Sequence, residues 1–185
     1  MPLWRLALPA VPAVLWVANS LHAVRGTAWR RAATAAALAA ATLIGWKVRF
    51  PGRHVMLARQ SLIRDASPLL QDAHLVAGLD IGWLGVATSS DIMDLAGITD
   101  PRVASLPGGH TTKKIPNSWF DFHKPDMLVL LTAPGEKLAP IWWQTLFARG
   151  VENRTSKLDY WRDCSVHGRV PLRYTQQFYV IVRCR

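Results

Sequence analysis

The chain has 185 residues, half of them hydrophobic, and a formal net charge of +10. This length allows one domain of ordinary size, or a smaller domain together with membrane segments. The charge does not point to nucleic acid, because nine of the 22 basic residues precede Asp65, where no acidic residue occurs, and the remaining 13 are nearly balanced by 12 acidic ones. A nucleic-acid-binding domain would carry its basic excess on the folded part, interleaved with stacking aromatics.

Two apolar runs open the chain. Residues 3–24 contain one formal charge in 22 residues, which is long enough to span a hydrocarbon core of about 30 Å. Residues 32–46 are uncharged and rich in alanine, and a helix from Trp29 to Trp46 would be roughly 26 Å long. We predict two transmembrane helices with basic flanks in residues 1–53. The alternatives are a signal peptide in the first run, although no clear cleavage site follows it, and a soluble alanine-rich hairpin.

The orientation of these helices in the membrane is not determined by the charge pattern. Three arginines lie in the link between the two runs, and four basic residues lie on the outer flanks. The excess of basic residues that marks a cytoplasmic side is therefore missing.

Residues 54–185 are predicted to form a separate α/β domain with a small mixed sheet. We expect a helix over 54–66 that ends at Pro68, and a helix over 138–150 with Gly150 as its C-cap. A third helix is expected to start at Pro101, after Thr99 or Asp100 as N-cap. Strands are expected in the apolar runs at 74–80, 91–97, 125–132 and 178–183. Strands that alternate with helices indicate an open α/β sheet.

The loop GGHTTKK, residues 108–114, is the first candidate for a binding site. Its glycines, hydroxyl groups and basic side chains, among them His110, Lys113 and Lys114, would suit a phosphate group. The spacing of a nucleotide-binding P-loop is not present. The alternative is a solvated connection between two elements.

Carboxylates near the ends of the predicted strands are the second candidate. Asp80, Asp91, Asp94 and Asp100 lie at strand ends or caps, where open α/β sheets often bind ligands, and a pair of them would be able to act as acid and base. The alternative is structural, with Asp100 as a helix cap and Asp94 bonded to neighbouring backbone N–H groups. A hydrolase that uses Asp80 or Asp94 remains a further possibility.

The sequence predicts no metal site and no cofactor. The histidines, cysteines and aspartates of residues 110–167 do not show the spacing of a tetrahedral site. The two cysteines, Cys164 and Cys184, are able to form a disulfide if the domain lies outside the cytoplasm, but their spacing does not require it.

The run LDIGWLGVATSSDIMDLAGITDPRVASLPGGHTTKKI, residues 79–115, followed by HKPDMLVLL, residues 123–131, resembles a known family. Over residues 54–132 it is similar to the C-terminal extracytoplasmic region of bacterial GT-C-type membrane glycosyltransferases. The two apolar runs resemble the last two spans of such an enzyme. The resemblance implies an enzyme that transfers a sugar from a polyprenyl-phosphate donor to an acceptor outside the membrane.

The catalytic carboxylate of such enzymes lies in the first extracytoplasmic loop, and no residue of this chain corresponds to it. We therefore expect the C-terminal portion of a glycosyltransferase-like protein, inactive alone, that contributes acceptor or partner binding. The expected location is the bacterial inner membrane, with residues 54–185 outside the cytoplasm. The expected partners are the lipid bilayer and a polyprenyl-phosphate sugar donor or envelope glycan, with no nucleic acid. The alternative is a membrane-anchored binding or scaffold module without enzymatic activity.

Overall fold

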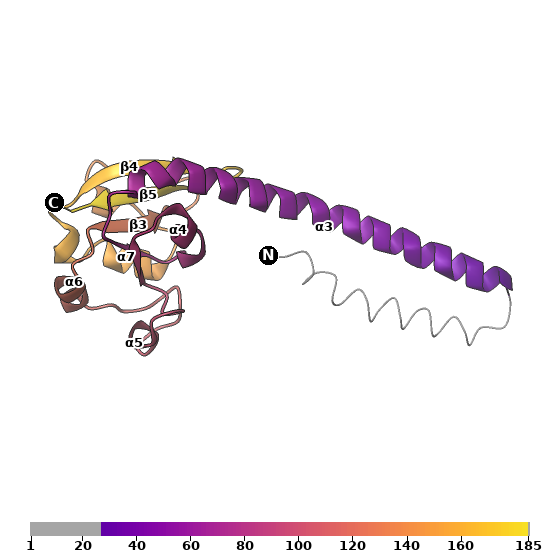
Figure 1. Cartoon of the computed structure of the whole chain (residues 1–185), viewed down its shortest axis with the longest axis horizontal. Coiled ribbons are helices and arrows are strands. Elements are labelled where there is room, and N and C mark those ends of the chain that lie inside the picture. Colours follow the sequence, from indigo (N-terminus) through magenta and orange to yellow (C-terminus); the bar gives the residue numbers. More distant parts are fainter. Residues whose placement is uncertain (1–26, 185) are drawn as a thin grey trace. The chain divides into compact units, whose positions relative to one another are not determined.

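The computed structural model describes residues 27–184 (Figure 1). The chain separates into two units, Met1–His54 and Val55–Arg185. The first predicted span, residues 3–24, lies outside the described residues. The second falls within helix α3, Thr27–Leu70, and among residues 27–184 no helix is both long enough and apolar enough to cross a bilayer. The uncharged run of this second span, residues 32–46, forms part of α3.

The last turns of α3 belong to the folded domain and continue beyond Pro68, where the helix was expected to end. A proline removes one backbone hydrogen bond, but near the end of a helix little of the ladder remains to be broken. Packing compensates for this loss, because Leu70 is completely buried. Leu69 lies against Gly168, where an added Cβ atom would come within 2.6 Å of the Leu69 Cδ1 atom, so a larger residue there would require the leucine side chain to shift.

The domain contains a five-stranded mixed sheet, as the sequence predicts. Its strands are β1 (Leu75–Gly78), β2 (Asp91–Asp94), β3 (Met127–Leu131), β4 (Ser165–Pro171) and β5 (Phe178–Arg183). They are arranged in the order β2-β1-β3-β5-β4. Strands β1, β2 and β3 are parallel, whereas β5 is antiparallel to both of its neighbours. The predicted strands match β1, β2, β3 and β5, and β4 was not predicted.

Helices cover both faces of this sheet. The end of α3 and helix α4 (Ile81–Ala87) pack on one face, where Leu62 and Trp83 share a core with Val129. Helices α5 (Pro101–Ala104), α6 (Asn117–His123) and α7 (Gly150–Thr155) lie on the other, with the short 3-10 helices η1 (Trp142–Gln144) and η2 (Asp159–Trp161). There Phe120 and Trp161 share a core with Leu128. Adjacent residues Leu128 and Val129 thus face opposite layers, as a strand requires.

The helix expected over 138–150 is not present. Residues 142–144 form only the short helix η1, Phe147 forms a β-bridge with Thr132 directly after β3, and Gly150 begins α7 instead of ending a helix. Two local features interrupt the helical pattern. Pro140 cannot donate a backbone hydrogen bond, and the Thr145 hydroxyl accepts one from the N–H of Ala139, which competes with a helix.

Candidate functional site

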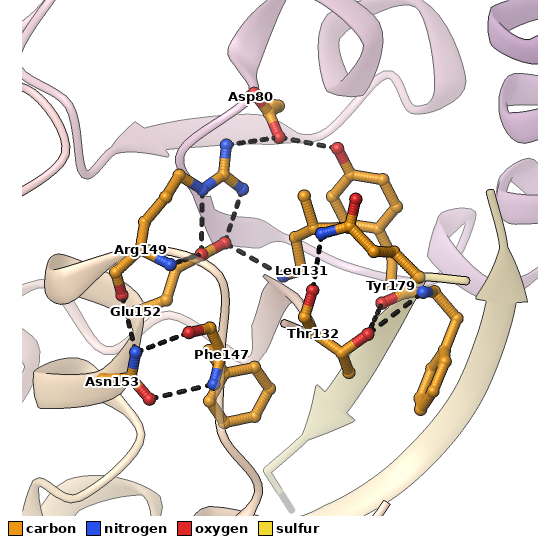
Figure 2. A network of polar contacts seen from close by, with 10 residues as sticks. Asp80, Leu131, Thr132, Phe147, Arg149, Glu152, Asn153 and Tyr179 are labelled. Atoms are coloured by element: carbon orange, nitrogen blue, oxygen red, sulfur yellow. Dashed lines mark hydrogen bonds and ion pairs between the residues drawn. The ribbon is translucent and has the colours of Figure 1, made fainter. Parts of the chain in front are cut away.

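A network of polar side chains lies at the carboxyl ends of β1 and β3 (Figure 2). Asp80 follows β1 and precedes α4, Arg149 precedes α7, Glu152 lies in the first turn of α7, and Tyr179 belongs to β5. The connection that leaves β1 runs through α4 over one face of the sheet to β2, and the connection that enters β3 runs through α5 and α6 over the other face. The parallel strands β1 and β3 are therefore neighbours at a point where the strand order switches. Open α/β domains commonly bind ligands at such a point.

Arg149 joins the two carboxylates of this network. Its Nη1 atom lies 2.8 Å from Oδ2 of Asp80, and its Nε atom lies 2.8 Å from Oε2 of Glu152. Nη2 of the same guanidinium donates to Oε1 of Glu152 at 2.5 Å, so this contact is bidentate. The hydroxyl of Tyr179 donates to Oδ2 of Asp80 at 2.6 Å.

Glu152 is completely buried, and its carboxylate also binds the backbone. The N–H groups of Leu131 and Arg149 donate to it at 2.9 and 3.1 Å. Its hydrogen bonds therefore tie the end of β3 to the start of α7. The bond from the N–H of Arg149 is one half of a capping box, in which the third helical residue reaches back to the N-cap.

Burial and charge pairing act in opposite directions on Arg149 and Glu152. Burial raises the pKa of Glu152, against the opposing effect of the Arg149 hydrogen bonds and charge. Burial alone would lower the pKa of Arg149, but Glu152 and Asp80 raise it, so this guanidinium stays charged. Burial, followed by the charge of Asp80, raises the pKa of Tyr179, which remains a neutral donor. The arrangement is thus an internally paired ion network that holds loops together.

Asp94 forms the centre of a tight turn after β2. Its side chain is 2% exposed and accepts hydrogen bonds from the N–H groups of Ala96, Gly97 and Thr99, and from the hydroxyl of Thr99. Gly97 has φ +69°, and a Cβ atom there would come within 2.6 Å of the Ala104 nitrogen. The motif DLAG therefore encodes a turn in which the aspartate bonds to the backbone, which is the structural alternative considered above.

Asp100 caps helix α5, as expected. Its side chain accepts a hydrogen bond from the N–H of Arg102 at 2.9 Å and forms an ion pair with the Arg102 guanidinium. Desolvation works in the opposite direction, but these contacts with Arg102 lower the pKa of Asp100.

The loop at residues 108–114 is only partly solvated. His110 Nδ1 lies 3.0 Å from the carbonyl oxygen of Ala96, which brings this loop against the Asp94 turn. Lys113 is buried, and its Nζ atom donates to the carbonyl oxygens of Ala104 and Leu106. Lys114 is exposed. Of the two lysines predicted to suit a phosphate group, Lys113 thus donates its ammonium hydrogens to backbone carbonyls instead.

Of the candidate site residues, the structure brings Asp94 and His110 near each other, because Asp94 accepts from the N–H of Ala96 and His110 contacts the carbonyl oxygen of Ala96. Asp80 takes part in the separate network with Arg149. Sequence reasoning missed Arg149, Glu152 and Tyr179. The only local signal was the three-residue spacing of Arg149 and Glu152, because the contact between Asp80 and Tyr179 joins residues 99 positions apart.

Cys164 and Cys184 form a disulfide, which indicates an oxidising, extracytoplasmic location for the domain. Within residues 27–184, no three histidine, cysteine, aspartate or glutamate side chains gather as a metal ion would need. Comparison of the chain with protein-family models, with curated proteins and with solved structures finds no match.

Proposed function

We propose that the α/β domain is an extracytoplasmic binding domain of a glycosyltransferase-like protein, and that it contributes acceptor or partner binding without carrying out the transfer. One observation supports this most directly. The candidate carboxylates are used for structure: Asp80 pairs with Arg149, Asp94 accepts four hydrogen bonds within its own turn, and Asp100 caps a helix. Because each of these three side chains already has partners within its own chain, the proposal gives them structural roles and no role as general acid or base.

The relation to glycosyltransferases rests on the resemblance of residues 79–115 and 123–131 to the C-terminal region of GT-C enzymes. The disulfide agrees with this proposal, because acceptors for polyprenyl-phosphate-linked sugars are modified outside the cytoplasm. In this proposal the apolar residues 3–24 anchor the protein to the bacterial inner membrane.

A second candidate is a membrane-associated scaffold module that binds a protein and no glycan. The exposed apolar side chains of α3 favour it. Leu38, Leu43 and Ile44 are each more than 60% exposed, although apolar side chains on all sides of a helix normally find a partner.

The test uses the full chain reconstituted in lipid nanodiscs. A radiolabelled polyprenyl-phosphate sugar and a purified envelope glycan fraction are added, and both transfer and retention of the glycan are measured. We expect the glycan to be retained on the protein without transfer of label. Transfer by this chain alone would overturn the proposal, and retention of a protein in place of the glycan would favour the scaffold module.

A further inference from the structure

A pocket of about 340 Å³ lies at the opposite end of the sheet from the Arg149 network. It opens between the end of α6, the start of β3 and the end of β5. Its lining residues are Asp121, Lys124, Pro125, Asp126, Tyr160 and Cys184. A volume of this size is at the lower end of the range of about 300 to 1,000 Å³ that small-molecule sites occupy.

The floor and the rim of this pocket differ in chemistry. Pro125, the ring of Tyr160 and the disulfide at Cys184 supply apolar surface, whereas Asp121, Asp126 and Lys124 supply charged groups. The charged lining residues comprise two hydrogen-bond acceptors and one donor. A few polar groups on an apolar wall are typical of sites that fix the orientation of a small ligand.

Three of the polar lining residues, Asp121, Asp126 and Tyr160, are held in place by hydrogen bonds within the chain. Asp126 accepts hydrogen bonds from the N–H groups of His74 and Leu75. Asp121 accepts one from the side chain of Asn117 at 2.9 Å, and the hydroxyl of Tyr160 donates to the carbonyl oxygen of Pro125. Side chains fixed in this way lose little entropy when a ligand binds.

Lys124 adopts a backbone conformation that lysine rarely takes. It ends helix α6 with φ 50° and ψ 53°, in the left-handed region that glycine prefers at this position. A non-glycine residue held there costs free energy, and such residues gather at functional sites. Glycine at this position would stabilise the helix end, so the lysine side chain at the rim of the pocket carries a cost in local stability.

The ligand class follows from the mixture of groups. Two carboxylates disfavour an anion, and Lys124 offsets part of their attraction for a cation. Burial, followed by the charges of Asp121 and Asp126, raises the pKa of Tyr160, in agreement with a net negative potential in the pocket. A neutral polyhydroxylated ring suits this lining, because its hydroxyl groups donate to carboxylates, accept from an ammonium group and leave C–H faces for the apolar floor.

We propose that this pocket binds one residue of a neutral saccharide, with Asp121 and Lys124 bonding to its hydroxyl groups. This inference rests on the proposed function, since it names the surface and the ligand class of acceptor binding.

The test measures binding of the full chain to neutral tri- and tetrasaccharides of glucose, galactose, mannose and N-acetylglucosamine, by isothermal titration calorimetry. We expect Asp121→Asn to weaken binding about tenfold or more, as loss of a charged hydrogen bond implies. Lys124→Gly should weaken it by a similar factor while it raises the thermal midpoint by about 2 to 4 °C, because glycine relieves the left-handed backbone. A loss of binding in a more stable protein is not a folding defect.

The controls are Glu136→Gln and Lys137→Gly, which make the same changes on the loop after β3. Binding lost in both pocket variants and kept in both controls supports the assignment. Equal binding by all variants overturns the pocket but leaves the proposed function intact. If the wild-type chain binds no member of the panel, the saccharide assignment is wrong, and the proposed function is then decided by the nanodisc experiment with the envelope glycan fraction.

Discussion

Replacement of Glu152 by alanine tests the role assigned to the ion network. Glu152 is completely buried and receives four hydrogen bonds, two from the Arg149 guanidinium and one each from the N–H groups of Leu131 and Arg149. Its removal leaves the guanidinium with Asp80 as its only carboxylate partner within the described residues, and leaves the N–H of Leu131 without its acceptor. Breaking a buried charge pair costs about 3 to 5 kcal/mol of unfolding free energy.

The assay is equilibrium unfolding in urea, followed by the fluorescence of the nine tryptophans. Glu136→Ala serves as the control, since this partly exposed glutamate lies on a surface loop and its removal should change stability by less than about 0.5 kcal/mol. In a double-mutant cycle, Arg149→Met with Glu152→Leu should cost less than the sum of the two single changes, because no unpaired charge is left between these positions. A loss below about 1 kcal/mol for Glu152→Ala would refute the reasoning.

Three further predictions concern the rest of the domain. Reduction of the Cys164–Cys184 disulfide should lower stability by about 3 kcal/mol, as the chain-entropy model gives for a loop with a sequence separation of 20, and an unchanged urea midpoint in reductant would contradict this. Asp100→Ala should cost about 1 kcal/mol as a lost helix cap. Arg102 lowers the pKa of Asp100 in the folded state, so the stability that this ion pair contributes is present above the pKa of the unfolded state and is lost as the pH falls through the folded-state pKa. The stability deficit of Asp100→Ala should therefore shrink in acid, and a deficit independent of pH would argue against the ion pair. Gly97→Ala should cost more than about 1 kcal/mol in a thermal melt, since its φ is +69° and the added Cβ would contact Ala104, and a neutral result would show that the turn relaxes.

The sheet was predictable where a strand carries a continuous apolar run. Residues 178–183 match β5 in both bounds, because every position from Tyr179 to Val182 is buried and apolar. The cap at Asp100 was predictable for a different reason, since the order of aspartate and proline encodes a helix start locally. Strand β4 was missed because its side chains are mostly exposed, so it shows no apolar run.

The network around Arg149 was not predictable, because its partners are distant in the sequence. The ion pair between Asp80 and Arg149 joins residues 69 positions apart, and only the fold brings them together. The prediction of a helix over 138–150 was wrong because it relied on the helical spacing of the apolar residues, although Pro140 disfavours a helix there. The sequence did not decide whether the two cysteines are paired, since their spacing does not show whether their Cα atoms come close in the fold. In the structure these Cα atoms lie 4.4 Å apart.

The central claim is that this domain binds and does not transfer. The most direct measurement follows the full chain with a polyprenyl-phosphate donor that carries a radiolabelled sugar and with an unlabelled envelope oligosaccharide, and then isolates the protein and the oligosaccharide separately. We predict that the oligosaccharide is retained on the protein in a saturable manner and carries no label. Label in the oligosaccharide at a rate above that of protein-free membranes would contradict the account.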